Sequence, residues 1–285
     1  MNILVTGASG QLGSEIRENS TEFSQYNFFF EDSKSLDITD FEKVEEFIVE
    51  NNIKAVINCA AYTAVDKAES EEQDAKNVNL LGVKNLISVL KGRGKLIHIS
   101  TDYVFNGKSY EPYKEEHYVD PIGVYGRTKR LGEEFILNSE VASIIIRTSW
   151  VYSSFGNNFV KTMLRLGKER DKLNVIFDQI GSPTYARDLA FVCLDIIDKD
   201  FSNFSKIYHY SNEGVTSWYD FAKAIMEVSG IQCYISPIET KDYPTPAKRP
   251  NYSLLNKSKI KKEFNITIPY WRDSLKDCIK KIEQN

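Results

Sequence analysis

Short apolar runs alternate with amphipathic stretches along the first 150 residues, and this alternation predicts strands separated by helices. The expected strands are the apolar runs 2–6, 27–31, 55–59, 95–100 and 143–147. Apolar residues recur at helical spacing in the stretches between them, which are 11–19, 40–51, 73–90 and 123–138. This order predicts an α/β fold, a doubly wound parallel sheet with helices on both faces.

The second half of the chain is less regular. It shows expected helices near 158–169, 188–198 and 217–229, a short strand near 174–177, and a proline-rich stretch at 243–250. No repeat of fixed period and no low-complexity tract interrupts it. We therefore expect a dinucleotide-binding domain over 1–150, to which parts of the second half return, and a smaller C-terminal substrate-binding lobe formed mainly by 151–285.

Charge and composition narrow the class of protein. A net charge of −4 and a pI near 5.6 give no basic footprint for nucleic acid. No apolar stretch approaches the ~20 residues that cross a bilayer, and the chain begins with a strand rather than a basic leader. Four scattered cysteines and three histidines lack metal-ligand spacing. These features predict a cytoplasmic protein without nucleic-acid or membrane partners and without a protein-built metal site.

A glycine-rich loop follows the first strand and opens the first helix. Its glycines permit a tight turn and close approach of a pyrophosphate, which the N–H groups at the helix start would face. A strand before the loop and a helix after it make the pattern much more specific than the glycines alone. The loop residues expected to bind a dinucleotide are Gly7, Gly10, Gln11, Leu12 and Gly13.

The residues after the second and third strands complete the expected cofactor site. Asp32 is the natural acceptor for an adenosine ribose hydroxyl and disfavours a 2′-phosphate, whereas Ser33 and the next residue, a lysine, would receive that phosphate. Both NADPH and NADH therefore remain open. Asp37 and Ile38 are expected to flank the adenine, although capping of the next helix explains Asp37 equally well. The nicotinamide side is expected to be lined by Ala60, Ala61, Tyr62 and Thr63.

Tyr125 and Lys129 stand four residues apart and would share one face of a helix. The ammonium is expected to lower the pKa of the phenol, so that Tyr125 donates a proton near neutral pH. Thr101 stands just after the fourth strand, where its hydroxyl would bind a substrate carbonyl and the alkoxide that develops from it. Lys129 would also hold the nicotinamide ribose. Together with the dinucleotide loop, these residues predict a carbonyl reductase.

These residues are similar to those of a known family, the extended short-chain dehydrogenases/reductases, which have the Rossmann fold. The similar blocks run from residue 2 to about 256, nearly the whole chain. They are Gly7–Gly13, Asn58–Glu69, Ser100–Phe105, Tyr125–Lys129, Arg147–Tyr152, Gly156–Phe159 and Pro244–Pro250.

The resemblance implies a substrate and contacts to it. It implies that a hydride passes from NADPH or NADH to C4 of a dTDP-4-keto-6-deoxy-L-sugar and that Tyr125 protonates the oxygen. By the same carry-over, Asp102 and Trp150 contact the sugar, and an indole offers a sugar ring a flat apolar face. The diphosphate needs donors, and the candidates are Asn157, Asn158, Lys161, Arg165 and Arg249. Arg249 is preferred, because prolines near it would stiffen its loop.

A departure from the family concerns metal. Some members resemble homodimers bridged by Mg²⁺ through carboxylates near the first helix and after the Gly-x-Pro-Thr block. Here Glu15 is present, but Arg187 stands where one of the acidic residues is expected. The sequence therefore argues against a magnesium bridge, and we expect a monomer or a homodimer.

Two alternative functions differ in what they require. A sugar-nucleotide epimerase or dehydratase on this fold would reoxidise its own cofactor, and dehydratases often carry Asp-Glu after the threonine, where this chain has Asp102-Tyr103. A non-catalytic regulatory subunit, similar to the β-subunit that binds methionine adenosyltransferase, needs no working acid. The complete set of Thr101, Tyr125 and Lys129 favours the reductase.

Overall fold

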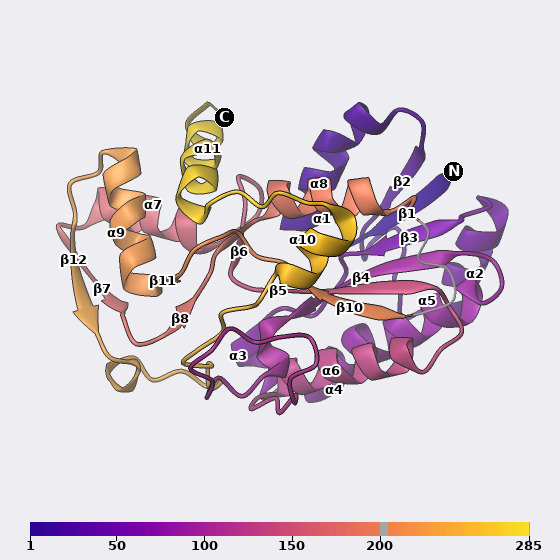
Figure 1. Ribbon diagram of the computed structural model, residues 1–285, viewed down its shortest axis with the longest axis horizontal. Coiled ribbons are helices and arrows are strands. Elements are labelled where there is room, and N and C mark those ends of the chain that lie inside the picture. Colours follow the sequence, from indigo (N-terminus) through magenta and orange to yellow (C-terminus); the bar gives the residue numbers. More distant parts are fainter. Residues whose placement is uncertain (200–204, 285) are drawn as a thin grey trace.

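The computed structural model describes residues 1–199 and 205–284, and a six-stranded parallel sheet forms its centre (Figure 1). The strand order is β10-β5-β4-β3-β1-β2. The strands are β1 (Asn2–Thr6), β2 (Asn27–Glu31), β3 (Ala55–Asn58), β4 (Lys95–Thr101), β5 (Ser143–Thr148) and β10 (Lys206–His209). The buried apolar runs Ile3–Val5 and Ile144–Ile146 are typical of parallel strands covered on both faces. The doubly wound α/β fold expected from the sequence is confirmed.

Helices cover both faces of this sheet. α1 packs against α8 on one face, and α2, α5 and α6 form a neighbouring series on the other (Figure 1). Their bounds are α1 (Gln11–Asn19), α2 (Phe41–Glu50), α5 (Gly82–Leu90), α6 (Val124–Leu137) and α8 (Ala186–Ile196). The helix expected over 73–90 is in fact composite, because α4 (Glu72–Lys76) and a π-helical stretch (Asn77–Leu81) precede α5. The short helix α3 (Val65–Ala68) lies just before them.

The second half of the chain contributes to the central sheet. β10 pairs in parallel with β5, and α8 packs beside α1. One apolar cluster therefore joins residues from both halves, including Ile3, Ile146, Leu189 and Tyr208. The sequence pattern did not predict β10, and α10 (Ser258–Phe264), which contacts it, was also missed.

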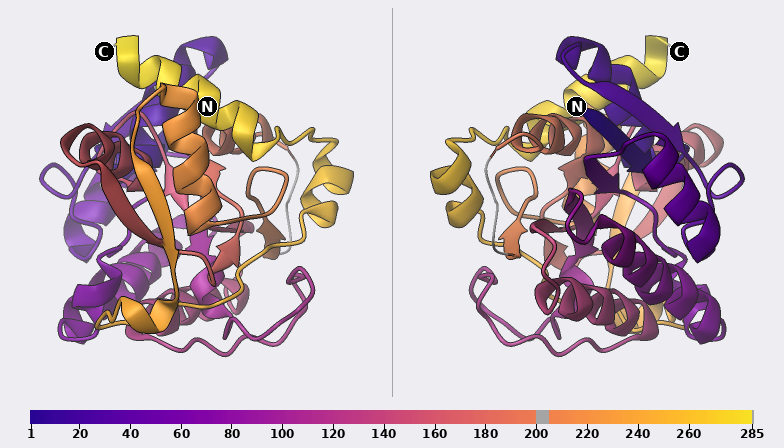
Figure 2. Two further views of the ribbon diagram at one scale, coloured as in Figure 1. Left: turned by 90° about the vertical axis from the view of Figure 1, so that its left-hand side faces the viewer. Right: turned by 90° about the vertical axis from the view of Figure 1, so that its right-hand side faces the viewer.

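The remaining elements form a second apolar cluster beyond the carboxyl ends of the sheet (Figure 2). They are α7 (Phe159–Glu169), β7 (Lys172–Ile176), α9 (Trp218–Ser229), β12 (Tyr234–Ile238) and α11 (Trp271–Gln284). β7 and β12 pair in parallel, and α7 packs against α9. The pairs β6 (Val151–Tyr152) with β9 (Thr184–Tyr185) and β8 (Ile180–Gly181) with β11 (Thr216–Ser217) connect this region to the sheet. β12 and α11 were not expected from the sequence.

Local capping explains where several helices begin. Asp40 accepts a hydrogen bond from the Lys43 backbone N–H and caps α2, and Ser217 and Asp220 form a reciprocal capping box on α9. Over residues 1–199 and 205–284, every helix is too short or too polar to cross a bilayer.

Candidate active site

The glycine loop packs directly against the segment that follows β3. Gly7 has φ +65°, and a Cβ on it would lie 2.7 Å from the Ala60 backbone nitrogen, so only glycine fits. No side chain caps α1. The buried Oε1 of Gln11 has no hydrogen-bond partner among the described residues. A helix start with free N–H groups and an unpaired polar atom beside it fits a pyrophosphate.

The turn after β2 is held by Asp32. Its Oδ1 accepts hydrogen bonds from the backbone N–H groups of Lys34, at 2.9 Å, and Ser35, at 3.3 Å. The bond from Lys34 is the main cause that keeps the pKa of this carboxyl below its ordinary value. Ser33 and Lys34 are left exposed at the tip of the turn, where a 2′-phosphate would be received.

The next two expected cofactor residues have local roles. The Oδ1 of Asp37 accepts from the Thr39 N–H at 2.9 Å and from its hydroxyl at 2.8 Å, so Asp37 closes a turn. The α2 cap is Asp40 and not Asp37. Ile38 is 4 % exposed and packs against Gly82, which leaves little of its side chain to flank an adenine.

Two of the expected catalytic residues, Thr101 and Tyr125, come together where β4 ends and α6 begins. The hydroxyl of Thr101 donates to the Oδ1 of Asp102 at 3.1 Å, and its hydrogen bond to Tyr125 acts to lower the pKa of that phenol. The ring of Tyr103 packs edge-on against Tyr125 with 5.5 Å between centroids. Gly126 allows this approach, since a Cβ there would lie 2.2 Å from the Tyr103 carbonyl oxygen.

The expected lowering of the Tyr125 pKa by Lys129 is wrong for this structure. Burial is the main cause that raises the pKa of Tyr125 to about 12. The hydrogen bond from Thr101 opposes this rise, and the charge of Asp102 contributes to it. The Nζ of Lys129 contacts the Ile99 carbonyl oxygen at 2.6 Å and a histidine ring nitrogen at 3.2 Å. Burial also lowers the pKa of Lys129 to about 8. The spacing of four residues predicted a shared helix face but not the depth of burial.

Asp102 is the second strongly perturbed acid of the site. Its side chain is 2 % exposed, and its Oδ2 has no hydrogen-bond partner within the described part of the chain. Burial raises the pKa of this carboxyl to about 7. A buried carboxyl oxygen without a partner beside Thr101 is suited to accept a hydroxyl of a bound sugar.

A buried ion pair holds α6 against the sheet. The sequence pattern did not predict it. Glu133 accepts from Arg147 at 2.8 and 2.7 Å, from the Ser100 hydroxyl at 2.6 Å and from Arg130 at 3.1 Å. Glu133 and Arg147 are 0 % and 1 % exposed. Because Glu133 lies one turn after Lys129 on α6, this pair ties the helix of the expected catalytic residues to β4 and β5.

The block Val65–Glu69 has two structural functions that its sequence alone did not reveal. Glu69 accepts the backbone N–H of Val124 at 2.8 Å and so caps α6, which has no side-chain cap of its own. Asp66 holds Arg249 in a two-pronged ion pair at 3.1 and 2.8 Å. Arg249 also donates to Thr245. The expected diphosphate donor is therefore engaged by a carboxylate, and the proline-rich loop is tied to α3.

Trp150 lies between β5 and β6 and has a strained backbone conformation. It has φ +50°, a conformation rarely adopted by a residue with a large side chain. Its ring stacks on Trp218 with 3.7 Å between centroids and 10° between planes. One face of the indole is thus covered by Trp218, the first residue of α9. The sequence pattern did not predict a role for Trp218.

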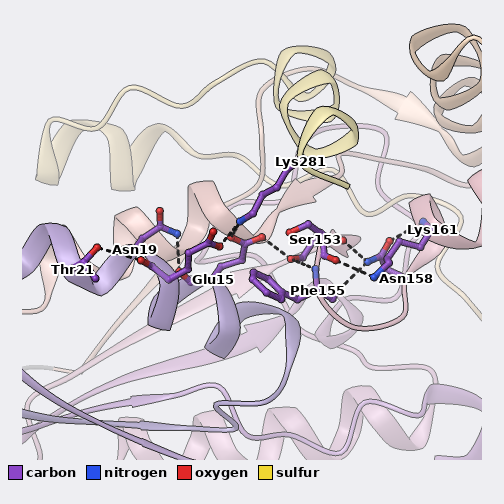
Figure 3. Close-up of polar contacts among 10 residues, drawn as sticks. Glu15, Asn19, Thr21, Ser153, Phe155, Asn158, Lys161 and Lys281 are labelled. Atoms are coloured by element: carbon purple, nitrogen blue, oxygen red, sulfur yellow. Dashed lines mark hydrogen bonds and ion pairs between the residues drawn. The ribbon is translucent and has the colours of Figure 1, made fainter. Parts of the chain in front are cut away.

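Figure 3 shows how the loop after β6 is fastened to α1 and α11. The buried Glu15 accepts from the Ser153 hydroxyl at 2.6 Å and pairs with Lys281 at 3.2 Å, and Lys281 also pairs with Glu18. Asn158 caps α7 through the Lys161 N–H and donates to the Ser153 carbonyl at 2.7 Å. The oxygen and the nitrogen of its side-chain amide are therefore both engaged within this segment. This argues against the expected contact of Asn158 with substrate.

Metal ligands are not gathered at Glu15. Within residues 1–199 and 205–284, no three His, Cys, Asp or Glu side chains lie together as a metal site would require. The ammonium of Lys281 neutralises the Glu15 carboxylate, and Arg187 lines the neighbouring hollow with Lys280 and Asp277.

Comparison with known proteins decides the family. The sequence matches the family described as RmlD substrate binding domain over residues 1–284. The chain belongs to this family. Among the similar proteins, the dTDP-4-dehydrorhamnose reductase of Aggregatibacter actinomycetemcomitans is 42% identical over an alignment of 285 positions that covers 96% of this chain and 97% of that protein.

Solved structures agree with this assignment. A dTDP-4-dehydrorhamnose reductase from Clostridium acetobutylicum has a TM-score of 0.95 and 41% identity, covering 99% of this chain and 100% of the other. A dTDP-4-dehydrorhamnose reductase from Bacillus anthracis, solved in complex with NADP, has a TM-score of 0.93 and 39% identity, covering 98% and 99%. The resemblance inferred from the sequence motifs is confirmed at the level of the RmlD family.

Proposed function

We propose that this chain reduces the C4 ketone of dTDP-4-dehydro-L-rhamnose and forms dTDP-L-rhamnose, with NADPH or NADH as the reductant. The observation that carries the proposal is that Thr101, at the end of β4, contacts Asp102 and Tyr125. Lys129 follows Tyr125 by one turn of α6, and the glycine loop fits a pyrophosphate. Curated relatives that share the whole length of the chain bear the name of this reductase.

Each residue is assigned a role that its surroundings support. Thr101 donates a hydrogen bond to the substrate carbonyl oxygen, and Tyr125 gives that oxygen its proton. Lys129 holds the nicotinamide ribose, and the orphaned oxygen of Asp102 accepts a sugar hydroxyl. The nicotinamide, when bound, supplies the hydride. Trp150 and the lobe formed mainly by residues 151–285 complete the contacts to the sugar nucleotide.

NADPH is the cofactor that the surroundings of β2 favour. Asp32 already accepts two backbone N–H groups, so its carboxylate is committed to the turn and holds Lys34 at the tip. The exposed Ser33 and Lys34 are suitable donors for a 2′-phosphate. The Bacillus anthracis structure, 39% identical, holds NADP.

The decisive experiment supplies freshly generated dTDP-4-keto-6-deoxy-L-sugar with NADPH or NADH and follows the absorbance of the reduced cofactor. Continuous oxidation with one equivalent of dTDP-L-rhamnose per cofactor is expected. An epimerase would convert the sugar without net oxidation of the cofactor, and a regulatory subunit would convert nothing. Either of these outcomes would refute the proposal.

Arg249 gives a separate prediction for substrate binding. We assign the Arg249 guanidinium, which Asp66 holds in place, to the diphosphate. Arg249→Ala is therefore expected to raise KM for the dTDP-sugar about ten-fold or more, with a smaller fall in kcat, because this charge-assisted contact would be lost. Arg272→Ala is the matched control, since Arg272 pairs with Glu227 between α11 and α9. Steady-state kinetics of both variants measure the effect. An unchanged KM in Arg249→Ala would mean that Arg249 serves only its ion pair with Asp66.

A further inference from the structure

A buried chain of hydrogen bonds runs beneath the site from the cofactor segment to Lys129. It begins at the backbone N–H of Ala60, passes through Asn58 at the end of β3 and His98 in β4, and ends at the Nζ of Lys129. The three side chains are 0 %, 0 % and 1 % exposed. Because water cannot reach them, each donor in the chain must face an acceptor.

The direction of the first link is fixed by the backbone. The Ala60 N–H can only donate, and it lies 3.1 Å from the Oδ1 of Asn58, which also accepts from the Thr6 hydroxyl at 2.7 Å. The amide NH₂ of Asn58 therefore faces the Nδ1 of His98 at 3.0 Å and donates to it. The Nδ1 atom must be the acceptor, so a neutral His98 ring carries its proton on Nε2.

The second link then places an N–H against Lys129. Burial keeps the pKa of His98 well below its ordinary value, so the ring is neutral. Its Nε2–H points at the Nζ of Lys129 at 3.2 Å. An ammonium has three donors and no acceptor, so this contact is matched only when Lys129 is a neutral amine that donates to the Ile99 carbonyl at 2.6 Å.

We propose that His98 is a positioning residue whose tautomer sets the protonation of Lys129 and couples it to the cofactor segment. When Lys129 takes up a proton from solvent, Nε2 must become an acceptor and the ring proton must move to Nδ1. The Asn58 amide then turns its oxygen toward His98, and the Ala60 N–H loses its acceptor. The role in catalysis rests on the function proposed above, in which Lys129 holds the nicotinamide ribose.

The groups around Lys129 are consistent with a balance between its charged and neutral forms. Glu133 on α6 raises the pKa of Lys129, as does Cys59 after β3, but burial is the larger effect and brings it to about 8. His98 faces Lys129 from β4, and Tyr125 precedes it by one turn of α6. The Nε2–H of His98 favours the neutral amine further, so the protonation of Lys129 changes within the range in which an enzyme works.

The tautomers are measured by ¹⁵N NMR of the histidine-labelled protein without ligand, with the His98 signal assigned by its loss in His98→Gln. His98 is expected to carry its proton on Nε2 at pH 9 and to shift to Nδ1–H as the pH falls to 6. His209 is the internal control, because its Nδ1 faces the Tyr113 carbonyl at 3.0 Å and must carry the proton at both pH values. A His98 ring with Nδ1–H at pH 9, or with one tautomer throughout, overturns the proposal.

Asn58→Asp provides an isosteric second test. A carboxylate cannot donate, so the introduced carboxylate is expected to lock His98 as Nδ1–H at every pH and to shift the alkaline limb of the kcat/KM profile upward by about one pH unit. An unchanged tautomer in this variant contradicts the role of Asn58. The NMR result needs no substrate, so a failure to turn over the dTDP-sugar would refute the proposed function and leave this inference standing.

Discussion

Tyr125→Phe is expected to lower kcat by a factor of about 10²–10⁴, because the variant has no hydroxyl to protonate the alkoxide. Burial raises the pKa of this phenol to about 12 in the free protein, so Tyr125 is protonated and able to donate at every working pH. The affinity for NADPH, measured by titration of the cofactor fluorescence, should change little. Single-turnover absorbance measurements on wild type and variant test the rate.

Tyr110→Phe is the control for this experiment, because Tyr110 is 89 % exposed and takes part in none of the contacts described for the site. It should retain the activity of the wild type. A loss of less than ten-fold in Tyr125→Phe would mean that another group supplies the proton. The first to examine would be Asp102, because its pKa of about 7 makes it the other acid of the site.

Glu133→Ala is expected to lower the free energy of unfolding by about 3–5 kcal/mol, because Arg147 would be left as a buried charge without a partner. Burial raises the pKa of Glu133, but the hydrogen bond and charge of Arg147 outweigh it and hold the net pKa below its ordinary value. This stabilisation is therefore complete above the ordinary pKa of a glutamate and is lost as the pH falls through the lower value of the folded state. Urea denaturation at pH 7 measures it.

The neighbouring residue supplies the control for that variant. Glu134 stands on the same helix but is half exposed, and it pairs with Arg130 at the surface, so Glu134→Ala should cost no more than about 1 kcal/mol. Replacing both members of the buried pair by apolar residues, as in Glu133→Leu with Arg147→Met, should recover much of the stability. Equal losses in Glu133→Ala and Glu134→Ala would contradict the importance of the buried pair.

The parts of this protein that local sequence predicts well are those in which the signal lies within one short stretch. Clear apolar periodicity and clear bounding residues mark the glycine loop, the five N-terminal strands and the helix that carries Tyr125 and Lys129. The structure contains each of them. β10 was missed because an edge strand of only Lys206–His209 carries too few positions to show a period.

The contacts that support the site could not be predicted from local sequence pattern. Asp66 and Arg249 are 183 residues apart, and His98 and Lys129 are 31 apart, so only the fold brings each pair together. The error over the Tyr125 pKa has the same origin. Spacing along α6 reveals which side chains share a face, but burial, which dominates the pKa values of both Tyr125 and Lys129, depends on the whole tertiary structure.

β10 lies late in the sequence, and this has a consequence for folding during translation. While the chain emerges from the ribosome, β5 and its run of isoleucines form an open edge of the sheet until Lys206–His209 has been synthesised. That unpaired edge is a place where a nascent chain can join another, so shielding by a chaperone matters most in this interval of translation.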